Sequence, residues 1–127
     1  MKTIISTDKA PAAIGTYSQA VVHQGTLYIS GQIPLDPVSM TLVSDEIEPQ
    51  IKQVFKNLKA VCDAANTNLN NVLKFNVYLT NLDHFPLVNE AMAAVLEQPY
   101  PARAAIEVSA LPKGAKVEVD AIVAMTS

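Results

Sequence analysis

Two stretches of the chain repeat apolar residues at spacings of three and four, which is the pattern of an amphipathic helix. The first runs from Asp45 to about Ala65, and its apolar positions are Ile47, Ile51, Val54, Phe55, Leu58, Val61 and Cys62. The second runs from Asn81 or Asp83 to the segment Gln98–Pro101, and its apolar positions are Phe85, Val88, Met92, Val95 and Leu96. We predict a helix over each stretch, with one face against a core.

The ends of the first stretch carry signals that start and stop a helix. Ser44 or Asp45 can cap its first turn, because a short polar side chain accepts a hydrogen bond from a free backbone N–H group. Pro49 is tolerated because it lies in that first turn. Asn66 can adopt the left-handed conformation that ends a helix.

Strands are expected on both sides of the first helix. A short strand around Thr3–Ser6 precedes two β-rich runs, Ser18–His23 and Thr26–Ser30, and the Gln24-Gly25 pair between them predicts a hairpin. Val72–Thr80 alternates strictly, so one of its faces should carry Leu73, Phe75, Val77 and Leu79.

The last two strands are expected at Ala102–Ser109 and Ala115–Ala124, joined by a tight turn at Leu111–Gly114. The order β-β-β-α-β-α-β-β indicates an α+β fold, with a single mixed sheet of about six strands and two helices on one face. Residues 1–127 are expected to form a single domain, because this length suits one compact core.

The other face of the sheet then needs a cover. Only 17% of the residues are charged, against about 25% in an average soluble domain. Few charges are therefore available to solvate the surface of a small particle. We expect copies of the same chain to cover the open face as a homo-oligomer.

Charge and composition restrict the function. Nine Lys and Arg against twelve Asp and Glu give a net charge of −3, and no basic run interrupts the chain, which disfavours a nucleic-acid partner. The single cysteine suits a reducing compartment. No signal peptide and no apolar stretch long enough to span a bilayer is found, so we expect a cytoplasmic protein that does not enter a membrane.

Arg103 and Glu118 are the main candidates for chemistry. Arg103 is the only arginine, and a guanidinium group suits a planar carboxylate. If the turn at Leu111–Gly114 pairs the last two strands, one face of the sheet would carry Arg103, Ala105, Glu107, Glu118 and Asp120. A cross-strand ion pair without a catalytic role explains the same pattern, and the pattern alone does not decide between them.

Metal, thiol and nucleotide chemistry are not expected. His23 and His84 stand alone, with no second His or Cys at ligand spacing. Cys62 lies in the apolar helix stripe and is expected in the core rather than as a nucleophile. No Lys-Ser/Thr pair follows Gly25 or Gly31, as a phosphate loop would require.

Several short motifs resemble one family. The most specific are PARAAIEVSAL at Pro101–Leu111 and VEV at Val117–Val119. Further motifs, in the same order along the chain, are Ala10–Gly15 with Tyr17, Ser30–Pro34, Asn57–Ala60, Thr80–Leu82, Asn89 and Leu111-Pro112. Together they identify the chain as a member of the Rid (reactive intermediate deaminase, RidA/YjgF) family over nearly its whole length.

The resemblance implies a chorismate-mutase-like subunit that assembles as a homotrimer, with active sites between subunits. The implied activity is the hydrolytic deamination of reactive 2-enamine and 2-imine acids, namely 2-aminoacrylate, 2-iminopropanoate and 2-iminobutanoate, to 2-oxo acids and ammonia. Pyridoxal-phosphate enzymes such as serine and threonine dehydratases release these substrates, which implies a functional link to them. No cofactor and no metal is implied.

The resemblance also implies roles by position. Arg103 would bind the substrate carboxylate, helped by the backbone N–H groups of Ala105 and Gly31. Glu118 would position or activate the attacking water, and Arg103 beside it would keep its carboxylate ionised. The residues lining the pocket would be Tyr17 and Ser30.

Some positions depart from the family pattern. Thr16 stands where Pro is usual, and Ala105 where many members have Cys, which should matter little if only its backbone N–H is used. Common aromatic residues are replaced by Met92, Val95 and Leu96. We expect these changes to alter pocket shape and substrate size rather than the reaction.

Two alternatives to an enzyme stay open. A non-catalytic member could bind 2-oxo acids or related carboxylates as a sensor or partner protein. The presence of Glu118 beside Arg103 favours the enzyme, because a binder needs only the arginine. Translation inhibition within the family suggests an RNA-directed role, but the acidic composition argues against it.

Overall fold

The computed structural model describes residues 1–125 and contains one six-stranded sheet. Its strands are β1 (Thr3–Ile5), β2 (Ala20–His23), β3 (Thr26–Gln32), β4 (Val72–Leu79), β5 (Ala102–Glu107) and β6 (Val117–Ala124). The helices are α1 (Ile47–Ala64) and α2 (Phe85–Val95), and short 3-10 helices lie at Leu69–Asn71, Leu82–His84 and Pro112–Gly114. The predicted α+β order of strands and α-helices is confirmed.

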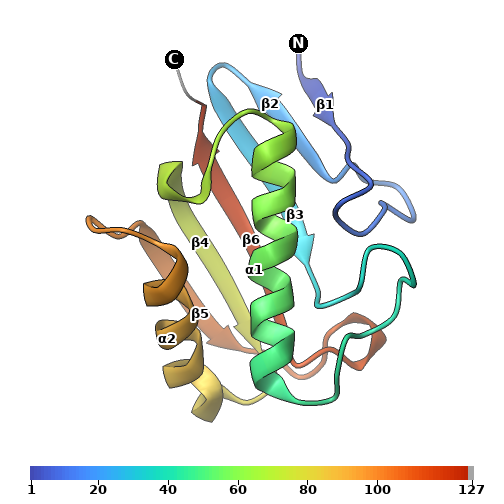
Figure 1. The fold of residues 1–127 in the computed structure, drawn as a ribbon, viewed down its shortest axis with the longest axis vertical. Helices are drawn as coiled ribbons and strands as arrows, with labels where there is room; N and C mark the ends of the chain where they lie inside the picture. Colours follow the sequence, from blue (N-terminus) through green and yellow to red (C-terminus); the bar gives the residue numbers. More distant parts are fainter. Residues whose placement is uncertain (126–127) are drawn as a thin grey trace.

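The strand order across the sheet is β1-β2-β3-β6-β4-β5 (Figure 1). Strands β4 and β5 are parallel, because α2 forms the crossover between them, and every other neighbouring pair is antiparallel. Although β5 and β6 are consecutive in the chain, β4 lies between them. The prediction that the Leu111–Gly114 turn pairs the last two strands is therefore wrong.

The physical reason is the apolar alternation of β4, which suits the buried centre of the sheet. Four of its eight residues are buried, whereas β5 has no buried residue, is exposed over most of its length and takes the edge. The segment after β5 and the segment before β6 lie on opposite sides of the end of β4. Val108 N donates to Leu79 O at 2.8 Å, and Thr80 N donates to Lys116 O at 3.2 Å.

The hairpin of β2 and β3 has the predicted turn. Gln24 and Gly25 both have positive φ, 49° and 79°, as a two-residue turn that matches the strand twist requires. The alternation of β4 is less regular than predicted. A register shift lies between Val72 and Lys74, so Val72 is buried and Leu73 is 52% exposed.

Helix α1 begins at Ile47, the first apolar residue of the predicted stripe. Its N-cap is Glu46, not Ser44 or Asp45, and the Ser44 hydroxyl accepts a hydrogen bond from Glu46 N at 3.0 Å. At the other end, Asn66 has the predicted left-handed conformation, with φ of 61°. The last turn of α1 therefore stops where the sequence indicates.

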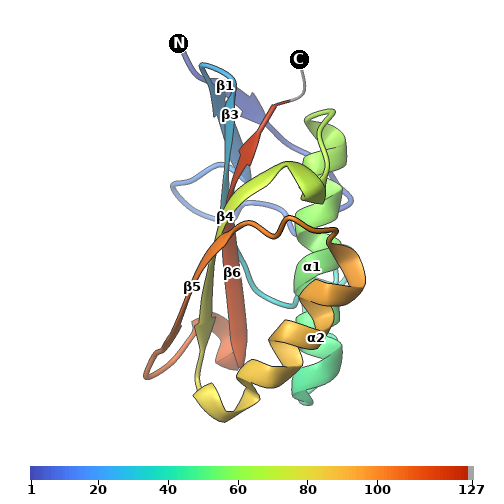
Figure 2. The same cartoon turned by 90° about the vertical axis from the view of Figure 1, so that its left-hand side faces the viewer.

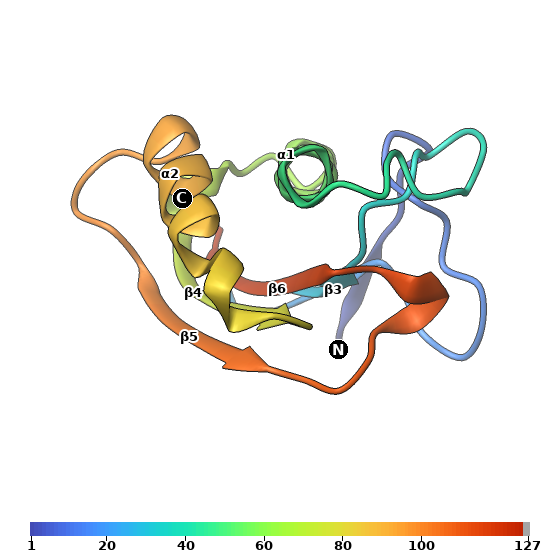
Figure 3. The same cartoon turned by 90° about the horizontal axis from the view of Figure 1, so that it is seen from below.

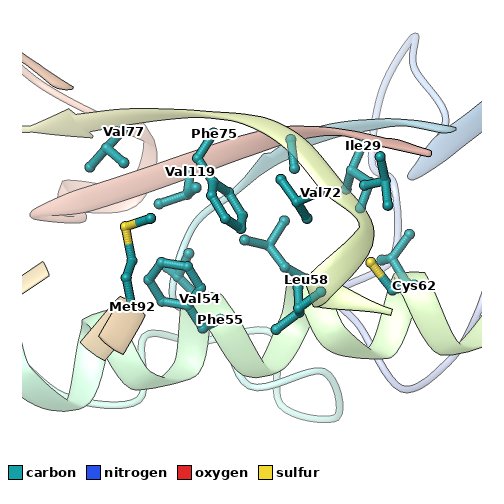
Figure 4. Packing of buried hydrophobic residues seen from close by; sticks show 14 of the residues in the cluster. Ile29, Val54, Phe55, Leu58, Cys62, Val72, Phe75, Val77, Met92 and Val119 are labelled. Carbon is teal, nitrogen blue, oxygen red and sulfur yellow. The ribbon is translucent and has the colours of Figure 1, made fainter. Parts of the chain in front are cut away.

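Both helices pack on one face of the sheet, and no helix or strand of residues 1–125 covers the other face (Figures 2 and 3). The apolar stripe of α1 meets the sheet in the core, where the Phe55 and Phe75 rings lie edge to face with centroids 5.6 Å apart (Figure 4). Within residues 1–125, no helix has the length and apolarity needed to cross a membrane.

Candidate active site

The pairing of the strands places Arg103 and Glu118 on opposite faces of the sheet. Arg103 lies beside Phe75, which is fully buried under the helices, so Arg103 belongs to the covered face. Glu118 lies beside Tyr78, one residue out of phase with that row, and belongs to the open face. The prediction that Arg103, Ala105 and Glu107 share a face with Glu118 and Asp120 is wrong, because β5 pairs with β4 instead of β6.

Glu118 lines a cleft of about 500 Å³, which we call the Glu118 cleft. The cleft lies between the N-terminal loop, the loop after β3 and the 3-10 helix before β6. It brings together four of the predicted site residues, namely Tyr17, Ser30, Gly31 and Glu118. Pro11, Ile14, Ile33, Leu35 and Met40 make much of its wall apolar.

Position 31 requires a glycine because the Glu118 side chain lies close to the backbone there. The pairing of β3 with β6 shifts between Ile29 and Gln32, so the backbone at Gly31 leaves the regular ladder. A Cβ atom at position 31 would collide with the carboxylate of Glu118. The glycine therefore lets the carboxylate lie against the backbone at the end of β3.

Ser30 and Tyr17 are partly engaged by the N-terminal loop. The Ser30 hydroxyl donates to Ser18 O at 2.6 Å, and Ser30 N donates to Gln19 O at 2.9 Å. The Tyr17 hydroxyl accepts a hydrogen bond from Ile14 N at 3.4 Å, and Tyr17 is 51% exposed. The exposed ring can therefore contact a ligand or a neighbouring chain.

The electrostatic surroundings of Glu118 favour its protonated form. Burial is the main cause that raises the pKa of Glu118, and the charge of Asp120 raises it further. Arg103 is not its neighbour within one chain, so the expectation that Arg103 keeps Glu118 ionised is not met there. A carboxylate with a raised pKa is suited to exchange protons near neutral pH.

Two buried amide side chains, for which the sequence pattern predicted no role, shape the loops of the Glu118 cleft. Gln19 donates to Thr7 O at 2.9 Å and Pro11 O at 2.7 Å, and so holds the N-terminal loop. Asn57 on α1 donates to Leu35 O at 3.1 Å in the loop after β3. A polar residue inside the apolar stripe of α1 was the signal that could have identified Asn57.

Arg103 lines a second cleft, of about 380 Å³, which we call the Arg103 cleft. One nitrogen, Nη1, donates to Asn89 Oδ1 at 2.6 Å and lies 3.6 Å from Met92 Sδ. The guanidinium carbon lies 4.5 Å from the centre of the Phe85 ring. These contacts from α2 fix the guanidinium group and leave Nη2 and Nε as donors for a carboxylate.

The remaining predicted residues are divided between the clefts and the core. Ala105 lies on β5 near Arg103, and β5 is an edge strand whose outer N–H groups have no strand partner within residues 1–125. Met92 belongs to the core and also lines the Arg103 cleft. Leu96 is in the core as well, and Val95 lies in the groove between α1 and α2, so neither lines the two clefts.

Residues 7–125 match the family described as Endoribonuclease L-PSP, and the chain belongs to this family, also called the Rid (RidA/YjgF) family. Among curated relatives, the 2-iminobutanoate/2-iminopropanoate deaminase of Mus musculus is 48% identical over 122 residues, which cover 96% of this chain and 90% of the relative. A RutC family protein of Pyrococcus horikoshii is 44% identical, with 96% and 97% covered.

Solved structures show the same fold. The crystal structure of RidA from an Antarctic Psychrobacter species has a TM-score of 0.93 and 54% identity, and the match covers 97% of this chain and 99% of that one. The structure of Escherichia coli TdcF with bound serine has a TM-score of 0.90 and 32% identity, with 98% and 99% covered.

Proposed function

We propose that the protein hydrolyses 2-enamine and 2-imine acids, such as 2-aminoacrylate, 2-iminopropanoate and 2-iminobutanoate, to 2-oxo acids and ammonia. Relatives named for this deaminase activity are 45–48% identical over nearly the whole chain. The observation that carries the proposal is Glu118, a half-buried carboxylate with a raised pKa in an open cleft. A protein that only binds carboxylates has no need of such a group.

Arg103 binds the substrate carboxylate in this proposal. Its Nη2 and Nε donors can form the two parallel hydrogen bonds that suit a carboxylate, because Nη1 is already used by Asn89. The edge position of β5 supports further donation from the Ala105 backbone, and the irregular end of β3 supports donation from Gly31. Tyr17 and Ser30 line the remaining wall.

Glu118 acts as the proton carrier. An enamine such as 2-aminoacrylate first gains a proton at C3 and loses one from its nitrogen, which gives the imine. Addition of water to the imine forms the C–O bond at C2, moves the C=N π electrons to nitrogen, and passes one proton of water through Glu118 to that nitrogen. Collapse of the carbinolamine passes the hydroxyl proton through Glu118 to the amino group, forms the C=O bond and releases ammonia. Positioning and general-base catalysis suffice for this reaction, since the imine carbon is already electrophilic.

The site is completed by a neighbouring copy of the chain. The Arg103 and Glu118 clefts lie on opposite faces of one sheet, so one chain cannot place both side chains on one small substrate. We propose a homotrimer with a chorismate-mutase-like subunit, in which each site combines the Arg103 cleft of one copy with the Glu118 cleft of the next. The open face, where Tyr28 and Ile106 are 46% and 50% exposed, is the surface we assign to assembly.

The cellular setting follows from the substrate. Serine and threonine dehydratases, which are pyridoxal-phosphate enzymes, release such imines, so we place this protein downstream of them without a physical contact. A single domain over residues 1–127 and a cytoplasmic location are part of the same proposal. The single cysteine supports that location, because disulfides are rare in a reducing compartment.

A coupled assay tests the proposal. A serine or threonine dehydratase generates the imine, and its decay is followed with and without the protein. Arg103→Lys keeps the charge but loses the two-pronged geometry, so both 2-oxobutanoate binding and turnover should weaken about tenfold or more. Glu118→Gln should lower turnover about 10²- to 10⁴-fold while 2-oxobutanoate, measured by calorimetry, still binds.

Two outcomes would reject parts of this proposal. If Glu118→Gln hydrolyses the imine at the parental rate, Glu118 is not the proton carrier. If the parent shows no rate above the uncatalysed decay but binds 2-oxobutanoate through Arg103, the protein is a carboxylate sensor. The fixed guanidinium group of Arg103 is the observation that favours this second candidate function.

A further inference from the structure

Asp120 lies two residues beyond Glu118 on β6 and on the same open face of the sheet. In the paired strand β4, Asn76 lies opposite Asp120, and Tyr78 lies opposite Glu118. Asn76 Nδ2 donates to Asp120 Oδ1 at 2.8 Å, and the Tyr78 hydroxyl donates to Asp120 Oδ2 at 3.1 Å. Each oxygen of Asp120 therefore has a donor from β4.

Asp120 and Glu118 form a pair of carboxylates that differ in the number of hydrogen-bond donors they receive. Two donors hold the negative charge of Asp120 in one place, about 7 Å along the strand from Glu118. Glu118 instead projects beside Gly31 into an open cleft where water can enter. When two carboxylates lie this close, the one with fewer donors takes up a proton more readily.

We propose that Asp120, fixed by Asn76 and Tyr78, is a positioning residue for the reaction, because its held charge makes Glu118 the member of the pair that accepts and returns the proton. This inference rests on the proposed function, in which Glu118 carries protons between water and the imine nitrogen. The direction of the pKa of Glu118, which the charge of Asp120 raises in addition to burial, agrees with it. Asp120 itself does not touch the substrate.

Other charged or titratable groups also surround Glu118. Tyr17 of the N-terminal loop and Lys113 of the 3-10 helix line the same cleft. Lys116 precedes β6, but its Nζ donates to Asp45 O at 2.6 Å, beside the start of α1. In the proposed trimer the Arg103 of a neighbouring copy adds a cation. The variants below leave all of these groups unchanged, so their effects are compared against one background.

The test is the pH dependence of kcat/KM for imine hydrolysis. The acid limb of the profile reports the protonation of Glu118, because only the ionised form accepts a proton from water. Asp120→Asn removes the charge, so the limb should move to lower pH by about half a unit or more, with a lower plateau because the base is weaker. Asp120→Glu keeps the charge and should leave the limb near its parental position.

Tyr78→Phe gives a shift of opposite sign. It removes a donor that offsets the charge of Asp120, so Glu118 should become easier to protonate and the limb should move to higher pH. This variant keeps the test decisive if Asp120→Asn does not fold. Asp63→Asn, an exposed change on α1 that breaks the Lys59–Asp63 pair, is the control and should not move the limb.

A ¹³C NMR titration of the Glu118 carboxyl carbon separates the two proposals. If the protein lacks deaminase activity, this titration still measures the effect of Asp120, and a lower midpoint in Asp120→Asn supports the inference. If the parent is active and depends on Glu118, but neither the rate profile nor the titration moves in Asp120→Asn and Tyr78→Phe, the role of Asp120 is wrong while the function stands. Shifts of the same sign in both variants would also overturn it.

Discussion

The covered and open faces of the sheet use the same two central strands for different purposes. On the covered face of β4 and β6, Phe75, Val77, Val117 and Val119 are at most 1% exposed and pack under the helices. On the open face, the next residues along these strands are Asn76, Tyr78, Glu118 and Asp120, which are all partly exposed. A strand turns successive side chains to opposite faces, so the core and the acidic pair are separated by a single residue.

The difference shows why Arg103 is accessible although it is on the covered face. β5 is an edge strand, and Arg103 reaches past the core to the residues of α2 that lie over that edge, Phe85 and Asn89. Glu118 is accessible for another reason, because nothing within residues 1–125 covers its face. Chemistry that needs both residues therefore requires two copies of the chain.

Subunit mixing gives the largest expected effect. Arg103→Ala and Glu118→Gln should each be nearly inactive alone, but trimers mixed from the two should contain sites with both residues intact. Random mixing gives each such site an even chance of an intact Arg103 and an even chance of an intact Glu118, so roughly a quarter of the parental turnover should return. The imine assay after joint unfolding and refolding measures it.

The matched control mixes Arg103→Ala with the double variant Arg103→Ala, Glu118→Gln. No site in these trimers has an intact arginine, so no turnover should return. If the first mixture also stays inactive although mixed trimers are seen by native mass spectrometry, the two residues do not share a site between copies.

Truncation of one residue on each face should separate folding from assembly. Phe75→Ala removes a fully buried ring that packs edge to face on Phe55, and should lower the free energy of unfolding by about 3–5 kcal/mol. Tyr28→Ser on the open face leaves the core intact and should instead weaken association. Denaturant unfolding and sedimentation at several concentrations measure the two effects.

The result for Tyr28→Ser decides whether the open face is the interface. The unfolding temperature of Tyr28→Ser should fall only because association is weakened. It should therefore depend on protein concentration. A Tyr28→Ser protein that sediments as the parent does at every concentration would show that assembly uses another surface.

Gly31→Ala tests how closely the site is fitted to Glu118. The added methyl group would collide with the carboxylate, which must move away from the end of β3. A displacement on the order of 1 Å should lower turnover about tenfold to a hundredfold, with a smaller change in 2-oxobutanoate binding. Gly25→Asn is the control, because that turn has open space and a positive φ that Asn tolerates. Equal losses in both variants would point to a general loss of stability.

Much of the covered face could be predicted from the sequence, because burial imposes a period on apolar residues. The stripe of α1 and the buried residues Phe75, Val77 and Leu79 of β4 follow from this pattern. The departure at Leu73 could not be seen, since a register shift changes which residue faces the core without changing the composition.

The candidate site was harder to predict because it depends on contacts between distant segments. The residues of the PARAAIEVSAL and VEV motifs were identified, but their faces were not. A short turn between two strand-like segments favours a hairpin, whereas here the more apolar β4 takes the position between β5 and β6. The partners of Asp120 depend on the pairing of β6 with β4, and the contact of Gly31 with Glu118 depends on the pairing of β3 with β6. The pattern of one segment carries no signal for either.

The smallest effect is expected on the covered face, at Cys62. Its thiol is fully buried in α1, and this burial raises the pKa of Cys62 to about 12, so the reactive thiolate is scarce at neutral pH. Cys62→Ala should leave imine turnover within a few-fold of the parent and cost about 1 kcal/mol of stability through the lost packing. Iodoacetamide should modify the parent only after unfolding, as measured by mass spectrometry. A hundredfold loss of turnover in Cys62→Ala, or rapid alkylation of the folded protein, would mean that the chemistry is not confined to the open face and the sheet edge.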